Sequence, residues 1–332
     1  MSVPHHGAMA TSTGSGREPH SDFAVMTKGL TKAYGTRMAV SGIDLAIPRG
    51  SLSGFVGPNG AGKTTTIRML LDLIRPTAGA GWVLDKPLNR PSEFLPKVGA
   101  LVENPAFYPA LSGRENLRVL SRLGNIADDR IEPLLEMVGL GERGDDHFRS
   151  YSLGMKQRLG IAAALLPDPE LFILDEPTNG LDPAGIAEMR VLLQTIAKDG
   201  RTVLVSSHLL SEVEQMCTHL VVIRSGKLVF QGQVSDLLDA QNVEVTARPE
   251  DPADLMALGI LADQLGKRAT VVNGQVTIAA SDDDFSGQFN RAAMERGITL
   301  VHLSADRPRL EEAFLALTDG DNESATSSSH NG

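Results

Sequence analysis

The chain has 332 residues, of which 42% are hydrophobic, enough for one or two domains with a sizeable core. The formal net charge is -10, and residues 240–332 carry most of it with 15 acidic and 7 basic residues, so nucleic acid is a poor partner. The single cysteine, Cys217, excludes a disulfide framework and a cysteine-based metal cluster, and we expect an inert buried thiol there.

Hydropathy and composition bear on two questions: whether the chain has a membrane or secretory segment, and how it divides into domains. No apolar run approaches the roughly 18 residues that a transmembrane helix needs, and residues 1–23 lack the apolar segment of a secretory signal. Residues 1–22 and 319–332 are rich in small polar residues, so we expect disordered tails there. The pattern changes near residue 240, which predicts a domain over residues 23–236 and a smaller one over residues 241–318.

The first domain alternates strand-like apolar runs with helical patterns. Between Ile67 and Ile74 the apolar residues recur on one helix face, which predicts a helix that is stopped by Pro76. The expected strands occupy residues 52–56, 171–174, 202–206, 220–223 and 228–230. Strands that alternate with helices indicate an α/β fold with a mainly parallel core sheet.

The second domain has a weaker pattern. Asn273 and Gly274 between two valine-rich runs give a two-residue hairpin signal. We expect strands at 243–246, 271–272, 276–278 and 299–303, and helices at 252–258, 286–296 and 310–317. This order is compatible with a small ferredoxin-like α+β domain.

A phosphate-binding loop follows the first expected strand of the core. Residues 57–64 match G-x-x-x-x-G-K-[ST] without a mismatch. The glycines let successive backbone N–H groups wrap phosphate oxygens, and the helix that follows directs its positive end at the same anion. Lys63 would add a charge on the β/γ-phosphates, while the Thr64 hydroxyl can ligate Mg²⁺. The alternative is a glycine-rich turn before a helix.

Two carboxylates end the apolar strand at residues 171–174. Asp175 lies 112 residues after Lys63, and we expect it to act on the metal through water. Glu176 can polarise the attacking water. Acidic residues at strand ends are also common without a function, and the pairing with the phosphate loop favours the catalytic interpretation.

Further motifs resemble those of ABC ATPases. Residues 151–158, Tyr-Ser-Leu-Gly-Met-Lys-Gln-Arg, resemble the family's signature motif, and residues 179–182, Asn-Gly-Leu-Asp, resemble its D-loop. His208 resembles the switch histidine and Tyr34 the aromatic residue that stacks on adenine, although a strand-end histidine and a core aromatic are the alternatives. The resemblance covers residues 23–236 and implies a P-loop NTPase fold with a helical signature subdomain.

The resemblance also implies ATP and Mg²⁺ as cofactors. The implied nucleotide-binding residues are Tyr34, Gly57, Pro58, Asn59, Gly60, Ala61, Gly62, Lys63, Thr64, Thr65, Ser152, Gly154, Asp175 and Asp182. The implied catalytic residues are Glu176, His208 and Glu103, and the implied metal ligands are Thr64, Glu103 and Asp175. Two sites would form at a head-to-tail interface with a second copy or a paralogous ATPase, which supplies Ser152 and Gly154.

A narrower resemblance points to the bacitracin-resistance and lantibiotic-immunity exporters and to daunorubicin-type exporters. It rests on residues 98–117, on the Ser-Leu-Gly-Met-Lys-Gln-Arg signature and on the ending at 310–318. Glu103 stands where most ABC ATPases have glutamine, Leu153 where the first signature glycine usually lies, and Met155 where another glutamine does. The resemblance implies export of an antibiotic, peptide or lipid-like compound.

An exporter of this kind needs separate membrane permease subunits, which would hold the chain at the cytoplasmic face of the membrane. We expect the permease to dock near residues 103–117, where Phe107, Tyr108 and Leu111 offer apolar surface, although internal packing of these residues is equally compatible. An importer subunit and a non-transport ABC ATPase remain alternatives. Only 89 residues separate Lys63 from Ser152, which leaves no room for the long coiled coils of repair-type members.

Overall fold

The computed structural model describes residues 21–102, 106–239, 243–280 and 284–306. A six-stranded sheet with the order β11-β10-β4-β9-β8-β7 forms the centre of the first domain. Its strands are β4 (Leu52–Val56), β7 (Val98–Leu101), β8 (Leu171–Asp175), β9 (Thr202–Ser207), β10 (His219–Arg224) and β11 (Lys227–Gln233). All neighbouring pairs are parallel except β10 with β11, so the expected mainly parallel core is confirmed.

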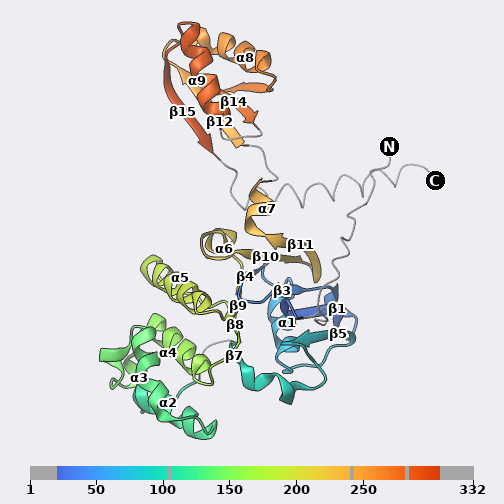
Figure 1. The fold of residues 1–332 in the computed structure, drawn as a ribbon, viewed down its shortest axis with the longest axis vertical. Helices are drawn as coiled ribbons and strands as arrows, with labels where there is room; N and C mark the ends of the chain where they lie inside the picture. The colour runs from blue at the N-terminus through green and yellow to red at the C-terminus, as the bar shows by residue number, and fades with distance from the viewer. Residues whose placement is uncertain (1–20, 103–105, 240–242, 281–283, 307–332) are drawn as a thin grey trace, which may run out of the picture.

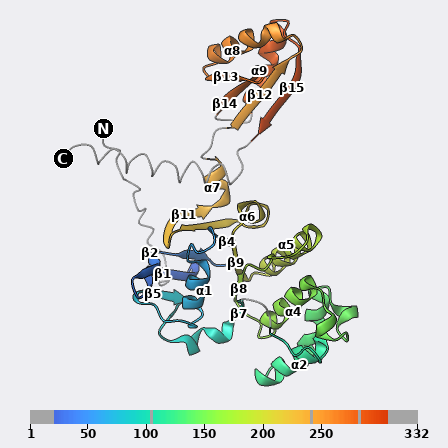
Figure 2. The same cartoon turned by 180° about the vertical axis from the view of Figure 1, so that it is seen from behind.

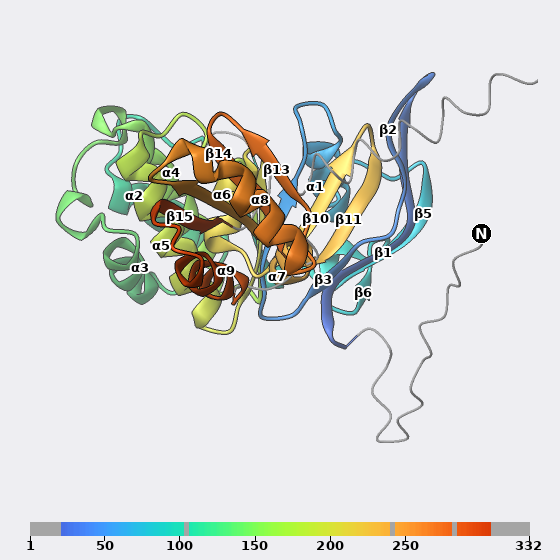
Figure 3. The same cartoon turned by 90° about the horizontal axis from the view of Figure 1, so that it is seen from above.

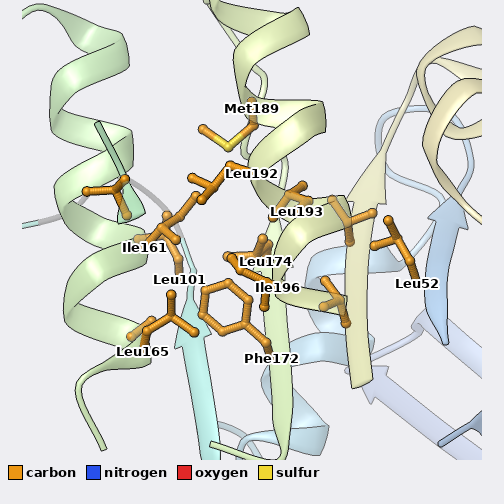
Figure 4. Packing of buried hydrophobic residues seen from close by; sticks show 14 of the residues in the cluster. Leu52, Leu101, Ile161, Leu165, Phe172, Leu174, Met189, Leu192, Leu193 and Ile196 are labelled. Carbon is orange, nitrogen blue, oxygen red and sulfur yellow. The ribbon is translucent and has the colours of Figure 1, made fainter. Parts of the chain in front are cut away.

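Side chains of the central strands alternate between two hydrophobic layers. In β8, Phe172 and Leu174 face one cluster, whereas Leu171 and Ile173 face the other. Helices α4 (Leu153–Leu165) and α5 (Pro183–Lys198) cover the first layer, as Figure 4 shows for the buried side chains around Phe172. Because both faces of β8 are covered, its residues 171–174 form an uninterrupted apolar run.

The second layer packs against helix α1 (Lys63–Leu70) and an antiparallel sheet, which the sequence patterns left undescribed. The sheet consists of β1 (Phe23–Tyr34), β2 (Arg37–Ile43), β3 (Ala46–Pro48), β5 (Ala78–Val83) and β6 (Lys86–Pro87). It lies on the opposite side of the core from α2, α3 and α4 (Figures 1 and 3).

Helix α1 is shorter than the apolar periodicity predicts. It ends at Leu70 and not before Pro76, because Asp72 adopts a left-handed φ of 55°. The N–H groups of Leu73 and Ile74 both reach back to the carbonyl of Arg68, which closes the helix. Because α1 ends at Leu70, the residues that follow it can extend toward the end of β1.

The helical signature subdomain contains α2 (Gly113–Leu123), α3 (Ile131–Met137) and α4. Ser112 and Glu115 form a capping box at the start of α2. Two further helices, α6 (Leu210–Met216) and α7 (Val234–Asp239), follow β9 and β11. Short 3₁₀ turns lie at Pro91–Glu93, Leu95–Lys97, Asp128–Arg130, Gly141–Arg143, Phe148–Ser150 and Pro252–Asp254.

Residues after α7 build a separate four-stranded antiparallel sheet (Figures 1 and 2). In chain order its elements are β12 (Val243–Pro249), α8 (Leu255–Gln264), β13 (Ala269–Val272), β14 (Gln275–Ala280), α9 (Phe285–Glu295) and β15 (Leu300–Asp306). The strand order β13-β14-β12-β15 is that of a ferredoxin-like unit with its own hydrophobic cluster. The helix expected at 252–258 begins later, at Leu255, after a 3₁₀ turn, and the helix expected at 310–317 lies outside the described residues.

Two absences hold for the described part of the chain. Among these residues no helix is both long and apolar enough to cross a membrane. Nor do the same residues contain a group of three or more His, Cys, Asp or Glu side chains that could hold a metal ion on its own.

Candidate nucleotide-binding site

The phosphate loop connects β4 to α1, and its backbone is confined by neighbouring strands. A Cβ atom on Gly57 would lie 2.3 Å from the carbonyl oxygen of Ile223, and one on Gly62 would lie 2.7 Å from that of Ala39. Gly62 also has a φ of 109°, which side chains rarely allow. No side chain caps the start of α1, so the N–H groups of its first turn are available to an anion.

Lys63 is held at the centre of this site. Its side chain is only 6% exposed, and its ammonium donates to the carbonyl of Gly57 at 2.7 Å. The same ammonium lies 3.1 Å from Oε1 of Glu176. The predicted phosphate-binding cation and the predicted catalytic carboxylate are therefore in direct contact.

The two carboxylate residues at the end of β8, Asp175 and Glu176, are held in place by one serine. Glu176 has a left-handed φ of 53°, so the chain turns sharply after Asp175. The hydroxyl of the buried Ser206 donates to Asp175 Oδ1 at 2.5 Å and accepts from the N–H of Glu176 at 2.9 Å. Ser206 thus fixes both residues, a role that the sequence patterns did not reveal.

His208 completes the contact network around Glu176. Its Nδ1 lies 2.7 Å from Oε2 of Glu176, so the two oxygens of this carboxylate contact His208 and Lys63 separately. Behind them, the buried carboxylate of Glu212 accepts hydrogen bonds from Thr178 at 2.7 Å and from Ser207 at 3.2 Å. Glu212 thereby joins the loop after β8 to the end of β9.

A cavity of about 620 Å³ lies over the phosphate loop, within the range of small-molecule sites. It brings together the predicted residues Tyr34, Asn59, Gly60, Ala61, Gly62, Lys63, Thr64, Thr65, Glu176 and His208. Its wall also includes Arg37, Met38, Ala39, Arg68 and Asn179, of which the sequence patterns singled out only Asn179, as part of the D-loop. Arg37 is the cross-strand partner of Tyr34, so the turn between β1 and β2 forms one wall.

Several predicted residues lie apart from this cavity within one chain. Ser152 caps α4 by accepting from the N–H of Met155, and Asp182 caps α5 by accepting from that of Gly185. Neither these two residues nor Gly154 line the cavity. Glu103 lies outside the described residues.

The loop expected to meet a permease is partly internal. Phe107 packs edge-on against Phe148, with ring centroids 5.1 Å apart. Tyr108 is 62% exposed, while its backbone is held by the side chain of Asn116. Of the two aromatic residues, Tyr108 therefore offers more surface to a partner, because Phe107 is partly buried.

The donor set fits Mg²⁺ bound together with a nucleotide. Thr64 lines the cavity, and Asp175 is tied through Ser206 to Glu176, which also lines it. Mg²⁺ commonly takes one or two protein oxygens and completes its shell with phosphate and water.

Comparison with known proteins identifies the family. The family model "ABC transporter" matches residues 40–179. The bacitracin transport ATP-binding protein BcrA of Enterococcus faecalis is 38% identical over 305 residues, 90% of this chain and 97% of that protein. The lantibiotic transport ATP-binding protein SrtF of Streptococcus pyogenes is 40% identical over 204 residues, 61% of this chain and 88% of that protein.

Solved structures agree with this assignment. The ATP-binding subunit of an ABC transporter has a TM-score of 0.58 at 29% identity and covers 64% of this chain and 91% of its own. The protein cbiO1 of Clostridium perfringens has a TM-score of 0.60 at 26% identity, with 65% and 90% covered. The family and fold expected from the motifs are confirmed: the chain belongs to the ATP-binding proteins of ABC transporters and is an ATP-binding ATPase.

Proposed function

We propose that the chain is the ATP-hydrolysing subunit of an ABC exporter that moves a peptide antibiotic or a similar compound through separate permease subunits. The match to BcrA, a bacitracin transport protein, carries the proposal, because it spans 90% of this chain, including the region after α7. SrtF, a lantibiotic transport protein, supports the same class of cargo.

Within the site, we assign each residue a part in ATP hydrolysis. Lys63 and the N–H groups of the phosphate loop bind the β/γ-phosphates, and Tyr34 stacks on adenine. Glu176 accepts the proton of the attacking water, and His208, in contact with Oε2, holds that carboxylate in place. Once Lys63 binds phosphate, its contact with Glu176 weakens and the carboxylate becomes available as a base.

Mg²⁺, when bound with ATP, would neutralise charge on the phosphates. We propose Thr64 and Asp175 as its protein ligands, with Ser206 orienting the Asp175 carboxylate. Glu103 is proposed as a third ligand and a catalytic residue on the strength of the family resemblance.

The second half of each site is proposed to come from another copy of the chain or from a paralogous ATPase. Ser152 is exposed at the start of α4, where its hydroxyl and the first N–H groups of the helix can meet a partner's γ-phosphate. Gly154, on the same turn, lets the partner approach closely. Asp182, at the start of α5, is assigned to the same interface.

The permease is proposed to dock beside Tyr108, which would hold the chain at the cytoplasmic face of the membrane. Tyr108 combines high exposure with a backbone fixed by Asn116, which suits a docking surface. The acidic balance of residues 240–332 makes nucleic acid an unfavourable partner.

Antibiotic resistance tests the proposed function. The chain would be expressed with its permease in a bacterium sensitive to bacitracin and lantibiotics, and the lowest inhibitory concentration of each compound measured. We expect the wild-type chain to raise this inhibitory concentration. The Lys63→Ala variant, which lacks the phosphate-binding cation, should leave the inhibitory concentration at the level of the empty host. Equal resistance with both chains, or with neither, would contradict the exporter assignment.

A further inference from the structure

The ring of Tyr34 has a cation on one face. The ammonium of Lys32 lies 5.1 Å from the ring centroid, within the range of a cation–π contact. Lys32 and Tyr34 are two residues apart on β1, where the register of pairing with β2 shifts between Lys32 and Ala33. Tyr34 is nevertheless 50% exposed, so the ammonium leaves much of the ring open to another ligand.

The side chain of Lys32 is not part of the wall of the nucleotide cavity. Tyr34 lines that cavity, but Lys32 does not. The Lys32 ammonium also donates to the carbonyl of Arg75 at 2.7 Å, and Arg75 lines a neighbouring cavity of about 790 Å³. The Lys32 ammonium therefore contacts the Tyr34 ring and the chain beyond α1 at the same time.

The backbone around Lys32 is fastened to the same segment. The N–H of Ala33 donates to the Thr77 hydroxyl at 3.0 Å, and the N–H of Thr77 donates to the carbonyl of Thr31 at 2.8 Å. These contacts flank Lys32 and hold the end of β1 against residues 75–77. The position of the ammonium is thus fixed by its contacts with residues 75–77.

We propose that Lys32 is a positioning residue for the nucleotide base: it holds the Tyr34 ring in the orientation that leaves the cavity-facing side free for stacking. This inference rests on the proposed role of Tyr34. Holding the ring before the ligand arrives reduces the entropy lost on binding. A cation–π contact at an exposed site supports roughly two- to five-fold tighter binding of ATP.

The test compares ATP with a ligand that has no base. Dissociation constants would be measured by calorimetry for ATP and for inorganic tripolyphosphate with wild type, Lys32→Met and Lys28→Met. We expect Lys32→Met to weaken ATP binding roughly two- to five-fold and to leave tripolyphosphate unchanged. Lys28 is an exposed lysine on the same strand, so Lys28→Met controls for the loss of one positive charge.

A double-mutant cycle separates positioning from general stability. In a Tyr34→Ala background, Lys32→Met should have no further effect on ATP binding, because the ring that it positions is gone. Lys32→Arg, which keeps the cation, should bind ATP within about two-fold of wild type. Equal weakening of ATP and tripolyphosphate, or an undiminished effect of Lys32→Met without the Tyr34 ring, would overturn the inference.

The two proposals fail in different ways. If Tyr34→Ala binds ATP as wild type does, the stacking role of Tyr34 is wrong and the Lys32 inference falls with it. If Tyr34→Ala weakens ATP binding but Lys32→Met does not, the stacking role survives and only the Lys32 inference is overturned.

Discussion

At the scale of the residue, Tyr34 tests how the base is recognised. Stacking on adenine is mostly apolar contact, worth about 1–3 kcal/mol, so Tyr34→Ala should weaken ATP binding roughly 5- to 150-fold. Tyr34→Phe keeps the ring and should bind ATP almost as wild type does. Calorimetric titration measures all three proteins, and identical affinities would place base recognition elsewhere on the cavity wall.

Ser206 tests the geometry of the two carboxylates. Ser206→Ala leaves the N–H of Glu176 and one oxygen of Asp175 without their partner, which costs about 1–3 kcal/mol in the folded state. Because Lys63 and Tyr34 are untouched, ATP hydrolysis should fall more than ATP binding. The matched control is Ser53→Ala, a buried serine in the same sheet whose hydroxyl contacts Ser51. Equal losses of hydrolysis in both variants would contradict the role of Ser206.

The reactivity of Cys217 tests how closely the core of the first domain is packed. The thiol is buried in the core cluster, and burial raises its pKa, so it remains protonated and unreactive at neutral pH. The expected burial of this thiol is thus confirmed, and its lack of reactivity stays a prediction. We predict no reaction with a thiol reagent in the native protein and one equivalent after denaturation, measured spectrophotometrically. Rapid labelling of the native protein would show that this part of the core opens.

At the scale of the element, the sequence patterns predict those strands, turns and helix caps that depend on residues adjacent in the chain. The buried strand β8 was evident because four consecutive apolar residues precede Asp175. The hairpin at Asn273 and Gly274 was evident because both residues adopt positive φ, which few other pairs allow. Ser152 of the signature motif caps α4, a position that suits the hydrogen-bonding hydroxyl of serine.

Features that depend on the backbone conformation of one residue or on distant contacts cannot be read from the sequence patterns. The end of α1 depends on the positive φ of Asp72, although the apolar periodicity continues to Ile74. The antiparallel sheet that presents Tyr34 has strands with irregular burial and register shifts, so its pattern is weak. Ser206 and Glu212 gained their roles only when β8, β9 and α6 came together.

At the scale of the whole molecule, the hydrophobic clusters indicate how the chain divides. The cluster of residues 243–298 has no members in common with those of residues 24–237. We predict that a chain truncated after residue 240 folds and binds ATP, because every nucleotide-site residue precedes that point. Circular dichroism and calorimetric titration with ATP measure this. An insoluble truncated chain, or one that binds no ATP, would show that the boundary is wrong.

The central claim is that two copies share each ATP and that Glu176 is the base that releases them. Glu176→Gln keeps the shape of the side chain but cannot accept the proton, so binding should survive while hydrolysis stops. Adding Ser152→Arg should block the second copy by filling the proposed phosphate contact.

Size-exclusion chromatography in the presence of ATP and Mg²⁺ tests this claim most directly. We predict a stable dimer for Glu176→Gln, a monomer for the double variant, and a wild type that returns to monomer as ATP is consumed. A monomeric Glu176→Gln protein that still hydrolyses ATP would contradict both the base assignment and the shared site.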